Sequence, residues 1–257
     1  MITSRDNAQV KKVAALREEA KYRARYQQYI VEGPRMLREL PEEDRISVFA
    51  SESFIKKEEN QRLAESVGAE TVPDVVFQHM AGMKTPQGIL AVARIPSHSL
   101  GELLTGGTVM ILENLQDPGN LGTILRTGEG AGIRGILADR TTADLYNPKT
   151  VRSTMGSLFR VPYVISDNLH EDIGLLKQAG FRVYAAHLKG TKMYTEFSYP
   201  SSSAFMIGNE GRGLSDSLAV EADEYLRIPM CGRVESLNAA AASAILMYEV
   251  YRQHNIL

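Results

Sequence analysis

The apolar run VMIL at Val109–Leu112, followed by NLQDPGNLGTILR at Asn114–Arg126, decides how the second half of this chain folds. The run predicts a buried strand, and the Asp, Pro, Gly and Asn residues after it predict a turn. The apolar periodicity that follows predicts a helix. Strand, polar turn and helix start is how α/β proteins build ligand sites. This turn alone is compatible with two interpretations: an α/β site, where Arg126 is suited to bind a phosphate, or an ordinary turn followed by a helix with a surface arginine.

The rest of the second half repeats this alternation of strand and helix. Its apolar runs are nearly continuous, as in parallel strands that are covered on both faces. The predicted strands are Val109–Leu112, Gly135–Ala138, Pro162–Ile165, Arg182–Ala186, Ala204–Ile207 and Tyr225–Ile228. A long alanine-rich helix is predicted from about Ser236 to His254, and its small residues allow close packing against another element or another subunit.

The first part of the chain predicts a smaller α/β domain over residues 1–96. The Ser, Gly and Thr residues of 97–107 predict a linker, and 108–257 form the second domain. Strands are expected at Gln28–Val31, Ile46–Ala50 and Gln87–Ile95, and helices at Asn7–Tyr29, Gly33–Leu40, Lys56–Val67 and Pro73–Ala81.

The first predicted helix has a basic face. Residues 1–30 hold seven Lys or Arg residues and three acids. With Tyr22, Tyr26 and Tyr29 nearby, this helix could contact an RNA backbone and stack a base. The alternative, slightly favoured by the pattern, is a solvated amphipathic helix that packs its tyrosines inward.

Composition excludes several classes of protein. The net charge is −2, so a nucleic acid would have to be met by local basic patches. The single cysteine, Cys231, excludes an internal disulfide and a cysteine-cluster zinc site, and we expect it to be a small buried hydrophobe. No apolar run is long enough to span a membrane and the first residues do not resemble a signal peptide, so we expect a cytoplasmic protein. The five histidines have no ligand spacing, and no metal is expected. His187 follows a strand and could line a cofactor cleft.

Two further loops follow predicted strands of the second half. GNEGRGLS at Gly208–Ser215 has three glycines but neither dinucleotide nor Walker A spacing, and Glu210 in its middle is unusual for an ordinary turn. RIPMCGRVESLNA at Arg227–Ala239 precedes the last helix. Ser236 is either a site residue or only the cap of that helix, whereas Asn238 in its first turn is harder to explain by capping alone. Loops at the carboxyl ends of strands converge on one crevice.

Together these three loops resemble the ordered motifs of the SpoU (TrmH) branch of the SPOUT methyltransferases, which are S-adenosylmethionine-dependent RNA 2′-O-ribose methyltransferases. The matching patterns are N-x-x-D-P-G-N-L-G-T-I-L-R-T, I-G-N-E-G-R-G-L-S and R-I-P-M-x-G-x-x-x-S-L-N. RSTMGSLFRVP at Arg152–Pro162 also fits, and YIVEGPRMLREL and TPQGILAVAR make the first domain similar to an L30e-like substrate-binding domain. The resemblance implies a parallel sheet with a deep C-terminal trefoil knot, and a homodimer with sites at the subunit interface.

The resemblance also implies the site residues. The catalytic set would be Asn120, Arg126, Glu210, Ser236 and Asn238. The residues that hold the S-adenosylmethionine cofactor would be Gly208, Asn209, Gly211, Ile228, Met230 and Leu237. Many members read S-L-N-V-S where this chain has Ala239 and Ala240 after Asn238, so we expect altered helix packing with activity retained.

The function implied is methylation of a ribose 2′-hydroxyl in RNA, with ribosomal RNA favoured by the auxiliary first domain. The alternatives are a transfer RNA 2′-O-methyltransferase, a catalytically silent RNA-binding relative, and an unrelated nucleotide-dependent oxidoreductase, which the missing G-x-G-x-x-G disfavours. Family members are proposed to use the arginine at Arg126 as general base. Because a guanidinium holds its proton far above neutral pH, binding the adjacent phosphate and stabilising an alkoxide is the other role open to it.

Overall fold

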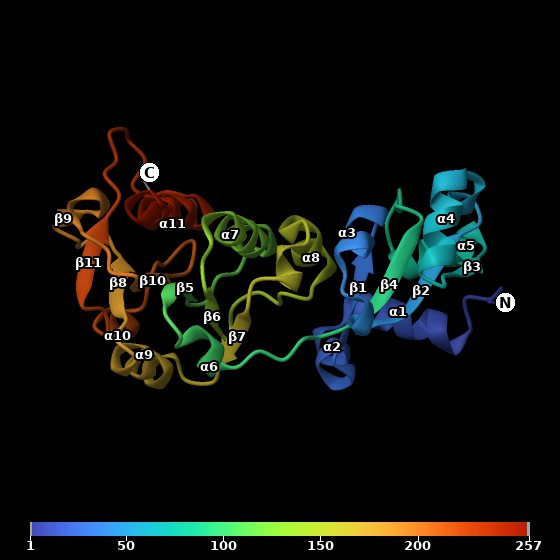
Figure 1. Cartoon of the computed structure of the whole chain (residues 1–257), viewed down its shortest axis with the longest axis horizontal. Coiled ribbons are helices and arrows are strands. Elements are labelled where there is room, and N and C mark those ends of the chain that lie inside the picture. Colours follow the sequence, from blue (N-terminus) through green and yellow to red (C-terminus); the bar gives the residue numbers. More distant parts are fainter. Residues whose placement is uncertain (1, 256–257) are drawn as a thin grey trace. The chain divides into compact units, whose positions relative to one another are not determined.

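A computed structural model describes residues 2–255, which form two compact units (Figure 1). The first unit contains the described residues up to Ser97 together with Asp144–Phe159, and the second contains His98–Ala143 and the residues from Arg160 onward. The segment Asp144–Phe159 therefore differs from the predicted bounds, which placed it in the second domain. The reason is packing: helix α8 (Pro148–Thr154) lies against strand β1 (Gln28–Glu32) of the first unit. The functional domain bounds stay a prediction.

The first unit is built on a four-stranded mixed sheet in the order β1-β4-β2-β3. Strands β1 and β2 pair antiparallel with β4, and β2 pairs parallel with β3. The three predicted strands are confirmed, and the three-residue β3 was not predicted. The remaining strands are β2 (Arg45–Ser51), β3 (Glu70–Val72) and β4 (Ile89–Arg94), and the helices after β1 are α3 (Pro34–Glu39), α4 (Glu58–Ser66) and α5 (Asp74–Ala81).

The first helix is not continuous, contrary to the prediction of one helix over Asn7–Tyr29. It is divided into α1 (Ala8–Glu18) and α2 (Ala20–Tyr26) by Glu19, whose backbone is extended at φ −114° and ψ 113°. The buried Arg23 stabilises the break, because its guanidinium donates to the carbonyls of Leu16 (2.7 Å) and Arg17 (3.1 Å) at the open end of α1. Its other nitrogens bind the Asp144 carboxylate at 2.5 and 2.9 Å.

The second unit is built on a seven-stranded sheet in which every pairing is parallel, in the order β7-β6-β5-β10-β8-β11-β9. The six predicted strands are all present, and the two-residue β9 was not predicted. The strands are β5 (Gly107–Leu112), β6 (Gly135–Asp139), β7 (Tyr163–Ser166), β8 (Arg182–Ala186), β9 (Lys192–Met193), β10 (Ser202–Ile207) and β11 (Glu224–Arg227).

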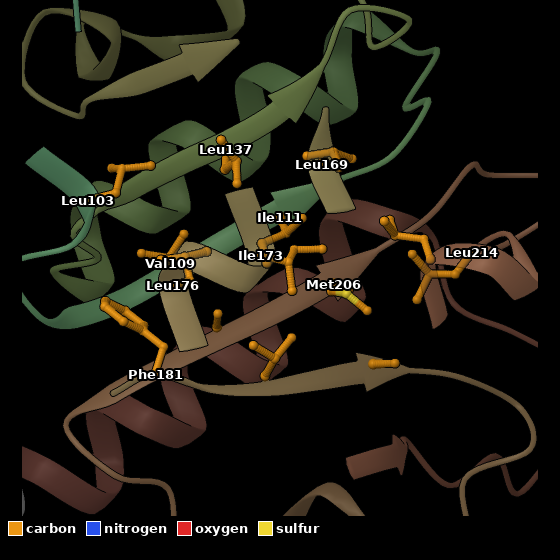
Figure 2. Packing of buried hydrophobic residues seen from close by; sticks show 14 of the residues in the cluster. Leu103, Val109, Ile111, Leu137, Leu169, Ile173, Leu176, Phe181, Met206 and Leu214 are labelled. Atoms are coloured by element: carbon orange, nitrogen blue, oxygen red, sulfur yellow. The ribbon is translucent and has the colours of Figure 1, made fainter. Parts of the chain in front are cut away.

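Helices cover both faces of this sheet, as its continuous apolar strands require (Figure 1). Helices α7 (Pro118–Ala131) and α11 (Ala239–Asn255) pack against each other on one face, and α6 (Leu100–Leu103), α9 (Leu169–Gln178) and α10 (Asp216–Ala219) lie on the other. Figure 2 shows the core beneath the second group, where Ile173 and Leu176 pack on Val109, Ile111 and Met206.

The stretch 97–107, predicted as a linker, contains α6. Ser99 and Glu102 form a capping box at the start of this helix, and Leu103 is fully buried in the core of the second unit. Most of the stretch therefore packs with the second unit. No described helix is long and apolar enough to cross a bilayer.

Strand β10 is inserted between β5 and β8, although both of those strands precede it in the chain. Ile207 at the end of β10 stands opposite Leu112 at the end of β5. The loops after these neighbouring strands therefore leave the sheet at the same edge, and the loop after β11 leaves two strands away. The return of the chain into the middle of the sheet is the topology from which a knot would be made, and the trefoil knot itself stays a prediction.

Candidate functional site

The Glu210 carboxylate joins the first two loops predicted from the sequence. It accepts hydrogen bonds from the backbone N–H of Gln116 (3.0 Å) and of Asp117 (2.9 Å), and from Nδ2 of Asn120 (3.0 Å). Asp117 in turn caps α7 by accepting from the Asn120 N–H at 2.9 Å. The carboxylate therefore holds the turn before α7 against the glycine loop.

Asn238 brings in the third loop. Its Nδ2 donates to Oδ1 of Asn120 at 2.8 Å, so the Asn120 amide is engaged on both sides. Its Oδ1 accepts from the N–H groups of Ala240 (2.9 Å) and Ala241 (3.2 Å) at the start of α11. The chain of contacts Glu210–Asn120–Asn238 ties all three loops together, and we call these three residues the amide–carboxylate bridge.

The hydrogen bonds that Glu210 accepts determine its protonation state. Partial burial alone would raise its pKa, but the hydrogen bonds from Gln116, Asn120 and Asp117 outweigh burial and lower the pKa below its ordinary value. Glu210 is therefore ionised at neutral pH. It is suited to position the loops and not to deliver a proton.

The glycine loop is fixed by its own backbone. A Cβ on Gly208 would lie 2.1 Å from the carbonyl carbon of Gly213, so no other residue fits there. Asn209 accepts from the N–H groups of Gly211 (2.9 Å) and Arg212 (3.1 Å), while its Nδ2 donates to the Asn114 carbonyl at 2.9 Å. The loop is thus attached both to itself and to the end of β5.

A cavity of about 470 Å³ lies beside the bridge, within the size range of small-molecule sites. Its wall includes every residue that the resemblance assigned to the cofactor: Gly208, Asn209, Gly211, Ile228, Met230 and Leu237. Glu210 and Ser236 also line it, whereas Asn120 and Asn238 do not. Loops from the ends of β8, β10 and β11 therefore surround one cavity.

The turn after β8 forms the part of the wall that the sequence indicated least. His187 was named as a possible lining residue and does line the cavity, and Leu188 and Lys189 beside it were not predicted. Leu188 is 74% exposed, which is unusual for a leucine. Burial and the nearby Lys189 lower the pKa of His187, so its ring is neutral at pH 7. A polar turn directly after a buried strand was the available signal.

Arg126 lies apart from the cavity. It is an exposed residue in the middle of α7, does not line the cavity, and has no side-chain partner among residues 2–255. The bridge and the cavity are thus formed without Arg126, whose side chain is exposed to solvent.

In the third loop, one of the two interpretations of Ser236 is excluded, and the expectation about Cys231 is wrong. Ser236 does not cap the last helix, because α11 begins at Ala239 and Asn238 accepts the hydrogen bonds of its first turn. The loop 228–238 has no regular structure, which leaves Ser236 exposed on the cavity wall. Cys231 is exposed and not buried, because that loop lies at the surface.

Comparison with known proteins agrees with this geometry. Residues 107–248 match the model of the SpoU rRNA Methylase family, and residues 7–91 match an MRM3-like substrate binding domain. The chain belongs to the SpoU rRNA Methylase family. The family match covers β5 through most of α11, and so it contains the bridge and the cavity.

Relatives of this SpoU family protein include characterised and structurally solved enzymes. It is 39% identical over 174 residues to the 23S rRNA (guanosine(2553)-2′-O)-methyltransferase RlmP of Bacillus subtilis, covering 68% of each chain. It is 36% identical over 148 residues to a putative TrmH family tRNA/rRNA methyltransferase of Staphylococcus aureus, covering 58% of this chain and 60% of that one. The crystal structure of an AdoMet-bound rRNA methyltransferase from Sinorhizobium meliloti is 31% identical and superimposes with a TM-score of 0.86, covering 100% of this chain and 98% of that one.

Proposed function

We propose that this protein transfers a methyl group from S-adenosylmethionine to a ribose 2′-hydroxyl of ribosomal RNA. The observation that carries the proposal is the amide–carboxylate bridge beside a cavity walled by three loops that each follow a parallel strand. Family membership and the RlmP relative support the same activity.

The residues of the cavity fit the cofactor. The wall combines backbone groups of Gly208, Asn209 and Gly211 with the side chains of Ile228, Met230 and Leu237. Apolar surface with a few placed polar groups is suited to a nucleoside with an attached amino acid. When bound, S-adenosylmethionine supplies an electrophilic methyl group on a sulfonium, so the protein itself has to align the 2′-oxygen with that group and assist loss of its proton.

The bridge provides the alignment. Asn120 is held by Glu210 on one side and by Asn238 on the other, so its amide cannot rotate freely. Groups fixed before the reaction lower its barrier, and good alignment is worth roughly 7–11 kcal/mol. We assign Asn120 and Glu210 to holding the active loop, and Ser236 to a polar contact at the cavity wall.

Arg126 is assigned to the RNA. Its guanidinium is suited to bind a phosphate of the substrate with two parallel hydrogen bonds and to stabilise the oxyanion that forms at the 2′-position. A second role, accepting the 2′-hydroxyl proton, is compatible with the same position. Both roles require Arg126 to contact the RNA ribose or phosphate at a place other than the cavity of its own chain, because it does not line that cavity.

The active form proposed is a cytoplasmic homodimer with its sites at the subunit interface. The position of Arg126 supports this assignment, because an exposed arginine away from its own cavity is available to the site of a second copy. Exposed Tyr248 and Tyr251 on α11, the helix that packs on α7, provide aromatic surface for such a contact.

The test is methyl transfer by the purified protein. Labelled S-adenosylmethionine is incubated with ribosomal RNA, with transfer RNA and with each RNA lacking the protein, and 2′-O-methyl sites are mapped. A new site in ribosomal RNA is expected. A site in transfer RNA alone replaces the ribosomal assignment, and cofactor binding by calorimetry without transfer to any RNA identifies a silent RNA-binding relative.

A further inference from the structure

The basic segment at the start of the chain has more positive charge than its acids can neutralise. Four of its seven cations have a carboxylate partner, and no ion pair is seen for the other three among residues 2–255. The pairs are Lys11–Asp6 at 2.9 Å, Lys21–Glu19 at 3.2 Å, Arg23–Asp144 at 2.5 Å and Arg17–Glu18. The remaining cations are Arg5, Lys12 and Arg25.

Two of these three cations, which have no ion pair among residues 2–255, lie over one aromatic ring. Lys12 Nζ lies 5.4 Å from the ring centroid of Tyr26, and the Arg25 guanidinium carbon lies 5.5 Å from it. Both distances are within cation–π range. The Tyr26 side chain is 38% exposed at the end of α2, and the ring of Tyr22 supports it at 4.5 Å.

The other two tyrosines of the segment are committed to the interior. Tyr29 is 1% exposed and packs on Tyr146 with ring centroids 4.8 Å apart. Tyr22 is partly buried against the core of the first unit. Of the two sequence interpretations, inward packing therefore holds for Tyr29 and Tyr22, and Tyr26 is left to meet a ligand.

We propose that Lys12, Arg25 and Tyr26 form a contact for a single-stranded stretch of the RNA substrate, with a base stacked on Tyr26 and the flanking phosphates bound by the two cations. This rests on the proposed function only in taking RNA as the substrate. An aromatic face beside unpaired cations is the combination with which proteins hold single strands, because every base has a π-face and every nucleotide a phosphate. A duplex does not fit, since its bases are already stacked on one another. A protein partner is disfavoured because Tyr26 is the one exposed ring among residues 2–30, whereas protein interfaces are built around a larger apolar centre.

The break at Glu19 makes this contact possible. A continuous helix over 8–26 would carry the second half of the segment along the axis of α1, whereas the extended residue redirects α2 and brings Tyr26 back beside Lys12 of α1. The buried Arg23 stabilises that break, so it acts as a positioning residue for the contact.

The experiment measures binding of the full-length protein to a fluorescent single-stranded RNA and to a duplex of the same sequence. Tyr26→Ala is expected to weaken single-strand binding about tenfold or more, and Tyr26→Phe by less than about twofold, since the ring is retained. Lys12→Gln with Arg25→Gln should lower the slope of log K against log salt by about 1.4, from roughly 0.7 for each phosphate contact. Lys57→Gln is the matched control and should change nothing, because Lys57 is an exposed lysine of the same unit with no ion pair seen within the described part of the chain.

Three results overturn the contact: unchanged single-strand binding by Tyr26→Ala, equal loss of duplex binding in that variant, or the same salt slope in the double variant and the control. Calorimetric binding of S-adenosylmethionine to each variant separates this outcome from failure of the proposed function. Normal cofactor binding shows that the second unit is intact, whereas absent methyl transfer by the wild type contradicts the enzyme assignment and leaves the RNA-binding comparison valid.

Discussion

Asn120 and Arg126, both on α7, differ in how many contacts their side chains make with the rest of the chain. Asn120 is bound on both sides, by Glu210 and by Asn238, and its backbone N–H is bound by Asp117. Arg126, in the next turns of the same helix, is exposed and has no side-chain partner among the described residues. The difference separates two features: the chain fixes the geometry of its loops internally, and it leaves Arg126 exposed, as the phosphate-binding role proposed for that residue requires.

The largest effect on activity is expected from substitutions of Arg126. Arg126→Ala should lower kcat by roughly 10²–10³-fold, as loss of one group that stabilises an oxyanion does, with the melting temperature unchanged because the side chain is exposed. Arg126→Lys should stay far below wild type, because an ammonium cannot form two parallel hydrogen bonds. Rates with saturating cofactor and RNA, together with calorimetric cofactor affinity, check this. If the lysine variant recovers most of the activity, the phosphate-binding role is wrong.

A smaller effect, mixed with stability, is expected at Glu210. Glu210→Ala removes the acceptor of two backbone N–H groups and of Asn120, so the free energy of unfolding should fall by about 1–3 kcal/mol. Activity should fall by up to about 100-fold through misplacement of the loops. Glu210→Gln keeps the shape of the side chain, so its stability and activity should lie between those of the wild type and of Glu210→Ala. Urea unfolding and initial rates are the measurements.

The pH dependence of this effect follows from the lowered pKa of Glu210. The unfolded chain binds the proton more readily, so the stabilisation is present above the ordinary pKa of 4.5 and is lost as the pH falls through the lower folded value. The stability difference between wild type and Glu210→Gln should therefore be constant from pH 8 to 6 and shrink below pH 4.5. A difference that grows in acid would contradict the bridge.

The Asn238 side chain has two roles, donating to Asn120 and capping α11, and substitutions can separate them. Asn238→Asp retains the oxygen that caps α11 but loses the donor to Asn120, so stability should hold while activity falls about tenfold. Asn238→Ala loses the cap as well and should cost about 1 kcal/mol of stability in addition. Thermal unfolding compared with initial rates distinguishes the pair. Equal melting temperatures for the two variants would remove the capping role.

The sequence predicted the secondary structure of the second unit better than that of the first. Parallel strands buried on both faces appear as continuous apolar runs, and β8 was predicted at its observed bounds, Arg182–Ala186. The break in the first helix was missed because its cause is distant: Arg23 binds Asp144, 121 residues away, and no local pattern shows that contact. The short β3 and β9 have too few residues to show an alternation.

The site was predictable as a set of residues but not as a set of contacts. Resemblance named Asn120, Glu210 and Asn238, yet only the fold shows that Asn120 stands between the other two. Ser236 and Asn238 are two residues apart in one loop, and the sequence left the helix cap open as a role of Ser236, whereas the structure gives it to Asn238. The choice depends on where α11 starts, and helix boundaries are the part of a pattern least fixed by periodicity.

The smallest expected effect concerns His187, which lines the cavity. Its Nδ1 accepts from the Lys189 N–H at 3.1 Å, so the neutral ring carries its proton on Nε2. Burial and Lys189 lower its pKa, while Asp216, paired with Lys189 at 3.0 Å, opposes that shift.

Protonation of this ring would add a positive charge to the cavity proposed to hold a cationic sulfonium. Cofactor affinity should therefore be constant from pH 8 to 6.5 and weaken only in more acid solution, by roughly fivefold for a repulsion of about 1 kcal/mol between like charges in contact with water. The other charged groups at the cavity are Lys189, Glu210, Arg212, Arg227 and Glu235. His187→Asn, which cannot gain charge, is the control, and calorimetry at several pH values is the measurement. If this variant weakens in acid as the wild type does, protonation of His187 is not what sets the pH dependence of cofactor binding.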